Sequence, residues 1–199
     1  MVEKNNKKII IVVGIPGVGK STIVNKVTEI LNHKKINTSV AIFGSMMLDE
    51  ANKMNISNRD EIRKLSISQQ HLLQEKTAKN IASIDSDVVI VDTHLFIRTR
   101  SGYYPGLPQN LLNIIQPSNL ILILADSNEI YERRLTDKSR NRDLTSLEEI
   151  ESELSISKTM ISSSSIISGA PFKIINNHNE KVDEAVSMFL EAIFINDEN

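Results

Sequence analysis

Short runs of Ile, Val and Leu alternate along the chain with longer segments in which apolar residues recur every three or four positions. Runs this short, with apolar residues at consecutive positions, are typical of parallel strands that are buried on both faces. We therefore predict five strands, at Lys8–Val13, Ser39–Phe43, Val88–Asp92, Asn119–Ala125 and Phe172–Asn176.

The longer segments predict helices. Thr145 and Glu148 have the spacing of a capping box that opens one of them, and Gly169 is suited to end it. The last helix places apolar side chains on one face. Alternating strands and helices favour an α/β fold of three layers, with a parallel sheet, helices on both faces and ligands at the carboxyl ends of the strands. The other helices are expected at Lys20–Leu31, Arg59–Ile84, Gln109–Ile115 and Asn128–Leu135.

The composition narrows the class of protein. The 199 residues, 40% of them hydrophobic, suit one globular domain, and a net charge of −2 gives no general basic field for nucleic acid. The absence of cysteine excludes disulfides and thiolate-zinc sites. The longest apolar runs are far shorter than the roughly 20 residues of a membrane span. We expect a single cytoplasmic domain over residues 1–199, without a membrane or nucleic-acid partner.

The most specific chemistry lies directly after the first predicted strand. The segment Gly14-Ile15-Pro16-Gly17-Val18-Gly19-Lys20-Ser21 matches the phosphate-binding loop pattern, between a strand and a helix as the pattern requires. Its glycines allow backbone N–H groups to curl around an anion. We expect Lys20 to add a mobile positive charge from a surface loop, and Ser21 to offer a hydroxyl ligand to Mg²⁺. The pattern predicts ATP binding.

Asp92 ends the third predicted run and matches the acidic residue that orients Mg²⁺ in such proteins, through water. Motor and regulatory ATPases usually carry a glutamate beside this acid, whereas Thr93 and His94 follow it here. The Asn-Lys-x-Asp guanine signature is also incomplete at both places where Asn-Lys occurs. Both differences favour transfer of the phosphoryl group to a bound acceptor.

Two groups of basic residues supply what transfer needs, because arginines that close over phosphates stabilise the developing charge and exclude water. The alternative is that each group forms a solvated helix face with ordinary ion pairs. The first group comprises Arg59, Arg63, Lys64, Arg98 and Arg100, and the second comprises Arg133, Arg134, Lys138, Arg140 and Arg142.

Nearly the whole chain resembles the archaeal-type adenylate kinases, a branch of the nucleoside monophosphate kinases with a short lid. GYYPGLP and RNRD carry the resemblance most specifically, because P-loop enzymes in general lack them. The matching stretches are GIPGVGKST at 14–22, FGSMM at 43–47, RDEIRKL at 59–65, VDTH at 91–94, GYYPGLP at 102–108, RNRD at 140–143, and SGA with KII at 168–175.

The resemblance implies reversible transfer of a phosphoryl group from ATP to AMP with Mg²⁺, giving two ADP. It also implies a five-stranded core sheet, an AMP-binding arm over about 44–84, an arginine lid over about 136–145, and a possible homotrimer. Lys20, Arg134, Arg140 and Arg142 would act on the transferring phosphates. Thr22 and the backbone near Asn177–Asn179 would contact ATP. The AMP site would comprise Gly44, Met47, Arg63, Arg98, Tyr103 and Gly106.

Two positions depart from the family pattern, since Lys158 stands where an arginine is usual and Ser164 where a tyrosine is usual. A lysine keeps the charge but cannot grip two oxygens in a planar fork. Three alternatives stay open from the residues alone. They are a related kinase that phosphorylates CMP or UMP, an ATPase whose nucleotide state gates a partner, and a structural or RNA-associated protein with a vestigial P-loop.

Overall fold

The computed structural model describes residues 7–99, 102–136 and 146–194, without the side chains of Arg59, Asp60 and Arg63. Five parallel strands form its central sheet, in the order β2-β3-β1-β6-β7. This confirms the predicted α/β fold and parallel sheet. The strands are β1 (Lys8–Val13), β2 (Thr38–Ile42), β3 (Val88–Asp92), β6 (Asn119–Leu124) and β7 (Phe172–Asn176).

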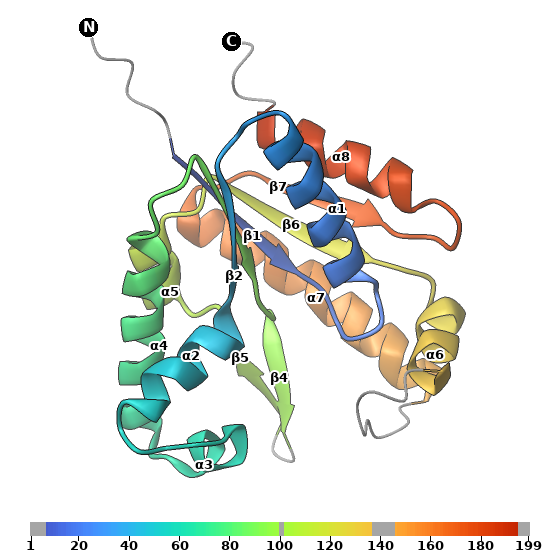
Figure 1. Cartoon of the computed structure of the whole chain (residues 1–199). Coiled ribbons are helices and arrows are strands. Elements are labelled where there is room, and N and C mark those ends of the chain that lie inside the picture. The colour runs from blue at the N-terminus through green and yellow to red at the C-terminus, as the bar shows by residue number, and fades with distance from the viewer. Residues whose placement is uncertain (1–6, 100–101, 137–145, 195–199) are drawn as a thin grey trace, which may run out of the picture.

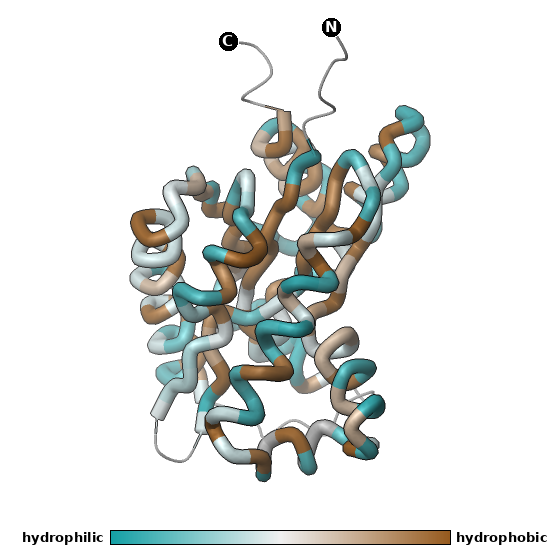
Figure 2. Tube along the Cα trace, turned by 90° about the vertical axis from the view of Figure 1, so that its left-hand side faces the viewer, coloured by the Kyte–Doolittle hydropathy of each residue, from teal (hydrophilic) through white to brown (hydrophobic). Residues whose placement is uncertain are grey.

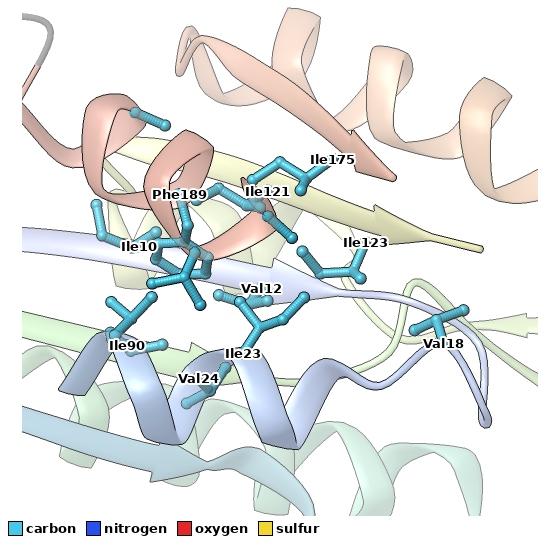
Figure 3. Packing of buried hydrophobic residues seen from close by; sticks show 14 of the residues in the cluster. Ile10, Val12, Val18, Ile23, Val24, Ile90, Ile121, Ile123, Ile175 and Phe189 are labelled. Atoms are coloured by element: carbon cyan, nitrogen blue, oxygen red, sulfur yellow. The ribbon is translucent and has the colours of Figure 1, made fainter. Parts of the chain in front are cut away.

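Alternate side chains of β1 point to opposite faces of the sheet, and both sets are buried. Ile10 and Val12 belong to a core cluster shared with α1 (Lys20–His33) and α8 (Val182–Phe194). Figure 3 shows this cluster, with Phe189 and Ile23 packed against the strands. The odd-numbered residues of β1 face a second cluster with residues of α4 (Ile67–Ala82), α5 (Gln109–Ile115) and α7 (Leu147–Ser168). The sheet is therefore the middle layer of three (Figure 1).

The distribution of hydropathy follows from this layering. In Figure 2 the central strands are largely brown, whereas the outer helices carry teal positions along their length. Every residue of β6 is buried, as expected for a strand with helices on both sides. No helix in the described part of the chain is long and apolar enough to cross a membrane.

The prediction of one helix over Arg59–Ile84 is wrong, because the segment forms two helices, α3 (Arg59–Lys64) and α4. Leu65 takes an extended conformation at the end of α3, and Ser66 starts the next helix with a capping box. The Ser66 side chain accepts from the Gln69 backbone N–H, and the Gln69 side chain accepts from the Ser66 backbone N–H. The serine thus satisfies the free amides of a new helix and stops the old one.

The capping box predicted at Thr145 and Glu148 lies one residue further along. Ser146 is the N-cap of α7, and its side chain accepts from the backbone N–H of Glu149 at 3.3 Å. Gly169 ends this helix in the left-handed conformation, as predicted. The other predicted boundaries differ by at most two residues, and Phe43 starts α2 (Phe43–Asn52) instead of ending β2.

A two-stranded antiparallel hairpin was not predicted. It consists of β4 (Phe96–Thr99) and β5 (Gly102–Pro105), and lies beyond the end of β3 (Figure 1). Its exposed β-branched and aromatic residues are suited to strands, but four residues per strand give little periodicity. The remaining helix, α6 (Ser127–Thr136), follows β6.

Candidate active site

The carboxyl ends of the five strands bring most of the predicted site residues to one edge of the sheet. The phosphate-binding loop follows β1, α2 follows β2, Asp92 ends β3, α6 follows β6 and Asn177 follows β7. Val12 and Asp92 are register partners, and the Thr93 backbone N–H donates to the Val12 carbonyl at 3.1 Å. The acid at the end of β3 therefore lies beside the start of the loop.

The phosphate-binding loop is anchored through its apolar side chains. Ile15 and Val18 are buried in the core, and Figure 3 shows Val18 at the loop that precedes α1. Gly19 has φ of 83°, and a Cβ atom there would lie 2.3 Å from Asn177 Nδ2, so only glycine fits. Gly19 is also the N-cap of α1 and has no side chain to cap this helix, and Ser21 and Thr22 in its first turn are exposed. This end of the helix can accept an anion.

Lys20 differs from the expectation of a mobile cation on a surface loop, because it is only 8% exposed. Its ammonium group pairs with the Asp92 carboxylate and donates to the Thr93 carbonyl at 2.8 Å. The physical reason is that β1 and β3 are adjacent, so the acid at the end of β3 lies within reach of the lysine that starts α1. A charge this deeply placed needs a partner. The pair fixes the lysine near the mouth of the loop.

Three successive carbonyl groups of the loop accept hydrogen bonds from outside it. Arg134 Nε donates to the Pro16 carbonyl at 2.9 Å, and an Arg133 terminal nitrogen donates to the Gly17 carbonyl at 3.3 Å. Asn177 Nδ2 donates to the Val18 carbonyl at 2.8 Å. These contacts hold the carbonyls on the outer side of the loop, which favours amides that face its concave side.

Arg134 is held between the loop and the long helix α7. Its guanidinium group pairs with Glu153 at 3.3 Å, and the two side chains are 7% and 9% exposed. The sequence analysis missed Glu153. Its spacing from Ile150 and Ser157, which places all three on the buried face of α7, was a usable signal. The predicted lid residues Arg140 and Arg142 lie outside the described residues.

Asn177 combines a buried side chain with a backbone that faces α6. It is 3% exposed, and its carbonyl accepts from Arg133 at 3.2 Å. Its Oδ1 atom has no hydrogen-bond partner within residues 7–99, 102–136 and 146–194. The structure thus gives Asn177 a role that the sequence did not predict, which is to support the phosphate-binding loop.

The hairpin β4–β5 carries two residues of the predicted AMP site opposite each other. Arg98 and Tyr103 are register partners, and the Tyr103 ring meets Phe96 edge-on with centroids 4.9 Å apart. Arg98 forms an ion pair with Glu149 in the first turn of α7. The hydrogen bond that Arg98 donates to the Glu149 carboxylate raises the pKa of Arg98 and lowers the pKa of Glu149. An incoming phosphate would compete with Glu149 for this arginine.

The other predicted AMP residues lie on separate elements around the same edge of the sheet. Gly44 is exposed near the start of α2, while Met47 is partly buried and packs against the core clusters on both sides of that helix. Gly106 donates its N–H to the Leu95 carbonyl at 2.7 Å, and a Cβ atom there would meet the His94 carbonyl at 2.1 Å. Arg63 is in α3, and its side chain lies outside the described residues.

The residues present fit a magnesium ion. Mg²⁺ prefers oxygen ligands and is bound with few protein groups and several from phosphates or water. Ser21 offers an exposed hydroxyl at the start of α1, and the Asp92 carboxylate, 16% exposed, pairs with Lys20, the residue before Ser21. The two positions that depart from the family pattern differ in burial. Lys158 is exposed on α7, whereas Ser164 is buried, with 6% of it exposed.

The sheet order, the phosphate-binding loop after the central strand and the acid on the neighbouring strand define a P-loop nucleotide-binding protein. A family profile described as an AAA domain matches residues 13–151. Among solved structures, a shikimate kinase from Acinetobacter baumannii matches with a TM-score of 0.62 at 12% identity, over 98% of this chain and 97% of that one. A thymidylate kinase from Candida albicans matches with a TM-score of 0.59 at 15% identity, over 96% and 93%. These structures share the fold.

The curated relatives are more similar in sequence. An adenylate kinase of Methanocaldococcus jannaschii is 35% identical over 94% of this chain and 98% of its own length. One from Sulfurisphaera tokodaii is 42% identical over 85% and 91%. The chain belongs to the adenylate kinase family, and it is therefore a phosphotransferase, as the resemblance in its sequence predicted.

Proposed function

We propose that this protein transfers the γ-phosphoryl group of ATP reversibly to AMP, giving two ADP, and so balances adenine nucleotides. The observation that carries the proposal is the arrangement at the phosphate-binding loop. Buried Lys20 is held at the mouth of the loop by Asp92 and the Thr93 carbonyl, while the first turn of α1 stays open to an anion. The relatives named adenylate kinase cover nearly the whole chain.

The donor triphosphate binds along the loop formed by residues 14–21 and along the first turn of α1, which contains Thr22. The loop amides and the helix N-terminus neutralise the phosphates, and Lys20 adds a charge that strengthens its contact as negative charge develops in transfer. Ser21 and Asp92 would hold Mg²⁺, Asp92 through water, and the ion would supply further charge neutralisation on the phosphates. The turn after Asn177 would face the adenine ring.

The acceptor site is built from the elements beyond β2 and β3. Arg63 of α3 and Arg98 of the hairpin hold the AMP phosphate, with Gly44, Met47, Tyr103 and Gly106 around the nucleotide. AMP binding replaces Glu149 as the partner of Arg98. Residues about 44–84 form the AMP-binding arm, and residues about 136–145 form the lid.

The arginines between donor and acceptor stabilise the transferring group. Arg134 reaches the loop from α6 and is already oriented by Glu153 and the Pro16 carbonyl. Arg140 and Arg142 close over the phosphates with the lid and exclude water. A fixed arginine and two brought in on closure together favour transfer to AMP over transfer to water.

The assembly and location of the enzyme rest on the family resemblance and on composition. We propose that the enzyme is a homotrimer, as the family resemblance implies. We also propose that it lies in the cytoplasm, a reducing compartment that the lack of cysteine suits. Light scattering at micromolar concentration should give about three times the 22.3 kDa mass of the chain. A species of 22.3 kDa alone would contradict the trimer and leave the catalytic proposal intact.

Initial rates with ATP and each of AMP, CMP and UMP test the proposed acceptor. We expect AMP to give the highest kcat/KM by at least about a hundredfold, the discrimination that lost base contacts can provide. Faster phosphorylation of CMP or UMP would identify a different monophosphate kinase. ATP consumption that does not depend on any monophosphate would instead identify an ATPase.

A further inference from the structure

Arg133 connects two segments of the donor site that follow different strands of the sheet, the loop after β1 and the turn after β7. One terminal nitrogen of its guanidinium group donates to the Gly17 carbonyl of the phosphate-binding loop at 3.3 Å. The other donates to the Asn177 carbonyl at 3.2 Å and to Asn179 Oδ1 at 2.6 Å, and Nε donates to the same Oδ1 at 3.2 Å. All three nitrogens of one side chain therefore serve the loop after β1 and the turn after β7.

Glu129 completes this connection from one helical turn earlier on α6. One of its carboxylate oxygens pairs with Arg133 at 3.3 Å, and the other accepts the backbone N–H of Asn179 at 2.9 Å. The two side chains are 25% and 19% exposed, so they are partly shielded from water. Glu129, Arg133 and the turn at 177–179 thus form one hydrogen-bonded unit, and Arg133 joins that unit to the loop.

We propose that Arg133 is a positioning residue that sets the phosphate-binding loop and the turn at 177–179 at the spacing needed by one ATP molecule. The inference rests on the proposed function, in which the loop holds the phosphates and the turn faces the adenine ring. Arg133 acts through backbone carbonyls, so its effect falls on donor affinity, because a preorganised site costs less to assemble on binding. Its neighbour Arg134, which pairs with Glu153, acts on the transferring group.

The planar fork of arginine matters more than its charge. Arg133 reaches acceptors on Gly17, Asn177 and Asn179 at once, from nitrogens that point in different directions. A lysine ammonium group is a single point charge on a flexible stem and cannot span these acceptors. Charge and geometry can therefore be separated by one substitution.

Steady-state kinetics of full-length variants, with ATP and AMP varied in turn, test this role. The variants are Arg133→Met, Arg133→Lys, Asn179→Ala and the Arg133→Met/Asn179→Ala double variant. Asn179 is exposed, so its variant retains the fold even if loss of Arg133 does not. Lys181→Met is the control for loss of one positive charge nearby, since Lys181 is exposed and pairs with Glu184 at 3.5 Å. Thermal unfolding of every variant measures its stability.

Arg133→Met should raise the KM for ATP about tenfold, because it removes a charge-assisted hydrogen bond. Its kcat should stay within about threefold, and its KM for AMP within about twofold, of the values for the parent enzyme. Arg133→Lys should not recover the loss. Asn179→Ala should raise the KM for ATP by a smaller factor, and the double variant should be no worse than Arg133→Met, because the two side chains act as one unit. Lys181→Met should match the parent enzyme.

Several results would overturn the inference. An unchanged KM for ATP, or an equal rise for ATP and AMP, would leave Arg133 with no specific role at the donor site. Recovery by lysine, or an equal loss in Lys181→Met, would reduce its role to charge. Multiplying effects in the double variant would mean that Arg133 acts without Asn179. If the parent enzyme itself failed to phosphorylate AMP, the proposed function would fail instead.

Discussion

Replacing Lys20 with methionine should damage both the rate and the stability of the enzyme. The substitution keeps the length of the side chain but removes the ion pair with Asp92 and the bond to the Thr93 carbonyl. Asp92 is 16% exposed, so its carboxylate would be left largely desolvated. An unpaired group of this kind costs about 1–3 kcal/mol, or a fall in Tm of about 3–10 °C for a chain of this size.

The rate should fall further than the stability explains. Lys20 would contact the phosphates as charge develops in transfer, and the loss of one such contact lowers kcat by about a hundred- to a thousandfold. Adding Asp92→Asn to Lys20→Met separates the two effects, because it removes the unpaired charge. The double variant should regain most of the Tm and none of the rate.

Initial rates with saturating ATP and AMP, together with thermal unfolding followed by circular dichroism, measure both effects. A Lys20→Met variant with near-normal kcat would show that the loop does not act on the phosphoryl group. A double variant no more stable than Lys20→Met would show that the Lys20–Asp92 pair does not carry the loss of stability.

Three other predictions follow from the acceptor site and the lid. Arg98→Ala or Arg63→Ala should raise the KM for AMP at least about tenfold, as expected for a lost bond to a charged group, with little change in the KM for ATP. Equal effects on both KM values would show that these arginines do not belong to the acceptor site. Glu149→Gln retains a capping-box residue but weakens the ion pair with Arg98, so it should lower the KM for AMP about two- to fivefold, and an increase would contradict competition for Arg98. The pKa of Glu149 is lowered in the folded protein. The Arg98–Glu149 pair is therefore fully formed above the ordinary pKa of glutamate and is lost as pH falls through the lowered pKa. The effect of Glu149→Gln on the KM for AMP should fade over that acidic range and be constant at neutral pH. Arg140→Ala or Arg142→Ala should lower kcat about a hundredfold, with a smaller change in the Kd of ATP measured by equilibrium binding. A raised Kd of ATP with an unchanged kcat would make these arginines ground-state contacts.

The sheet and the phosphate-binding loop could be predicted from sequence because they depend on local patterns. Short apolar runs mark the five strands, although only the three central ones, β1, β3 and β6, are buried along most of their length. The spacing of Gly14, Gly19, Lys20 and Ser21 defines the loop. The break at Leu65–Ser66 was also local, since Ser66 and Gln69 form a capping box. It was missed because apolar residues continue at helical spacing on both sides of it.

The contacts within the site depend on the tertiary fold and could not be predicted from local patterns. Lys20 meets Asp92 across 72 positions of sequence because β1 and β3 are neighbours in the sheet. The Arg134–Glu153 pair similarly requires the packing of α6 against α7. Both arginines of α6 were predicted as one basic group, yet they serve different partners, because adjacent positions on a helix point in different directions.

The fate of the γ-phosphoryl group tests the central claim most directly. The enzyme would be given ATP labelled at its γ-phosphorus together with unlabelled AMP, and the products would be separated and counted early in the reaction. Our account predicts that the label appears in the β-phosphoryl group of the ADP formed from AMP, with almost none in inorganic phosphate. Release of the label as inorganic phosphate, at a rate independent of AMP, would contradict it.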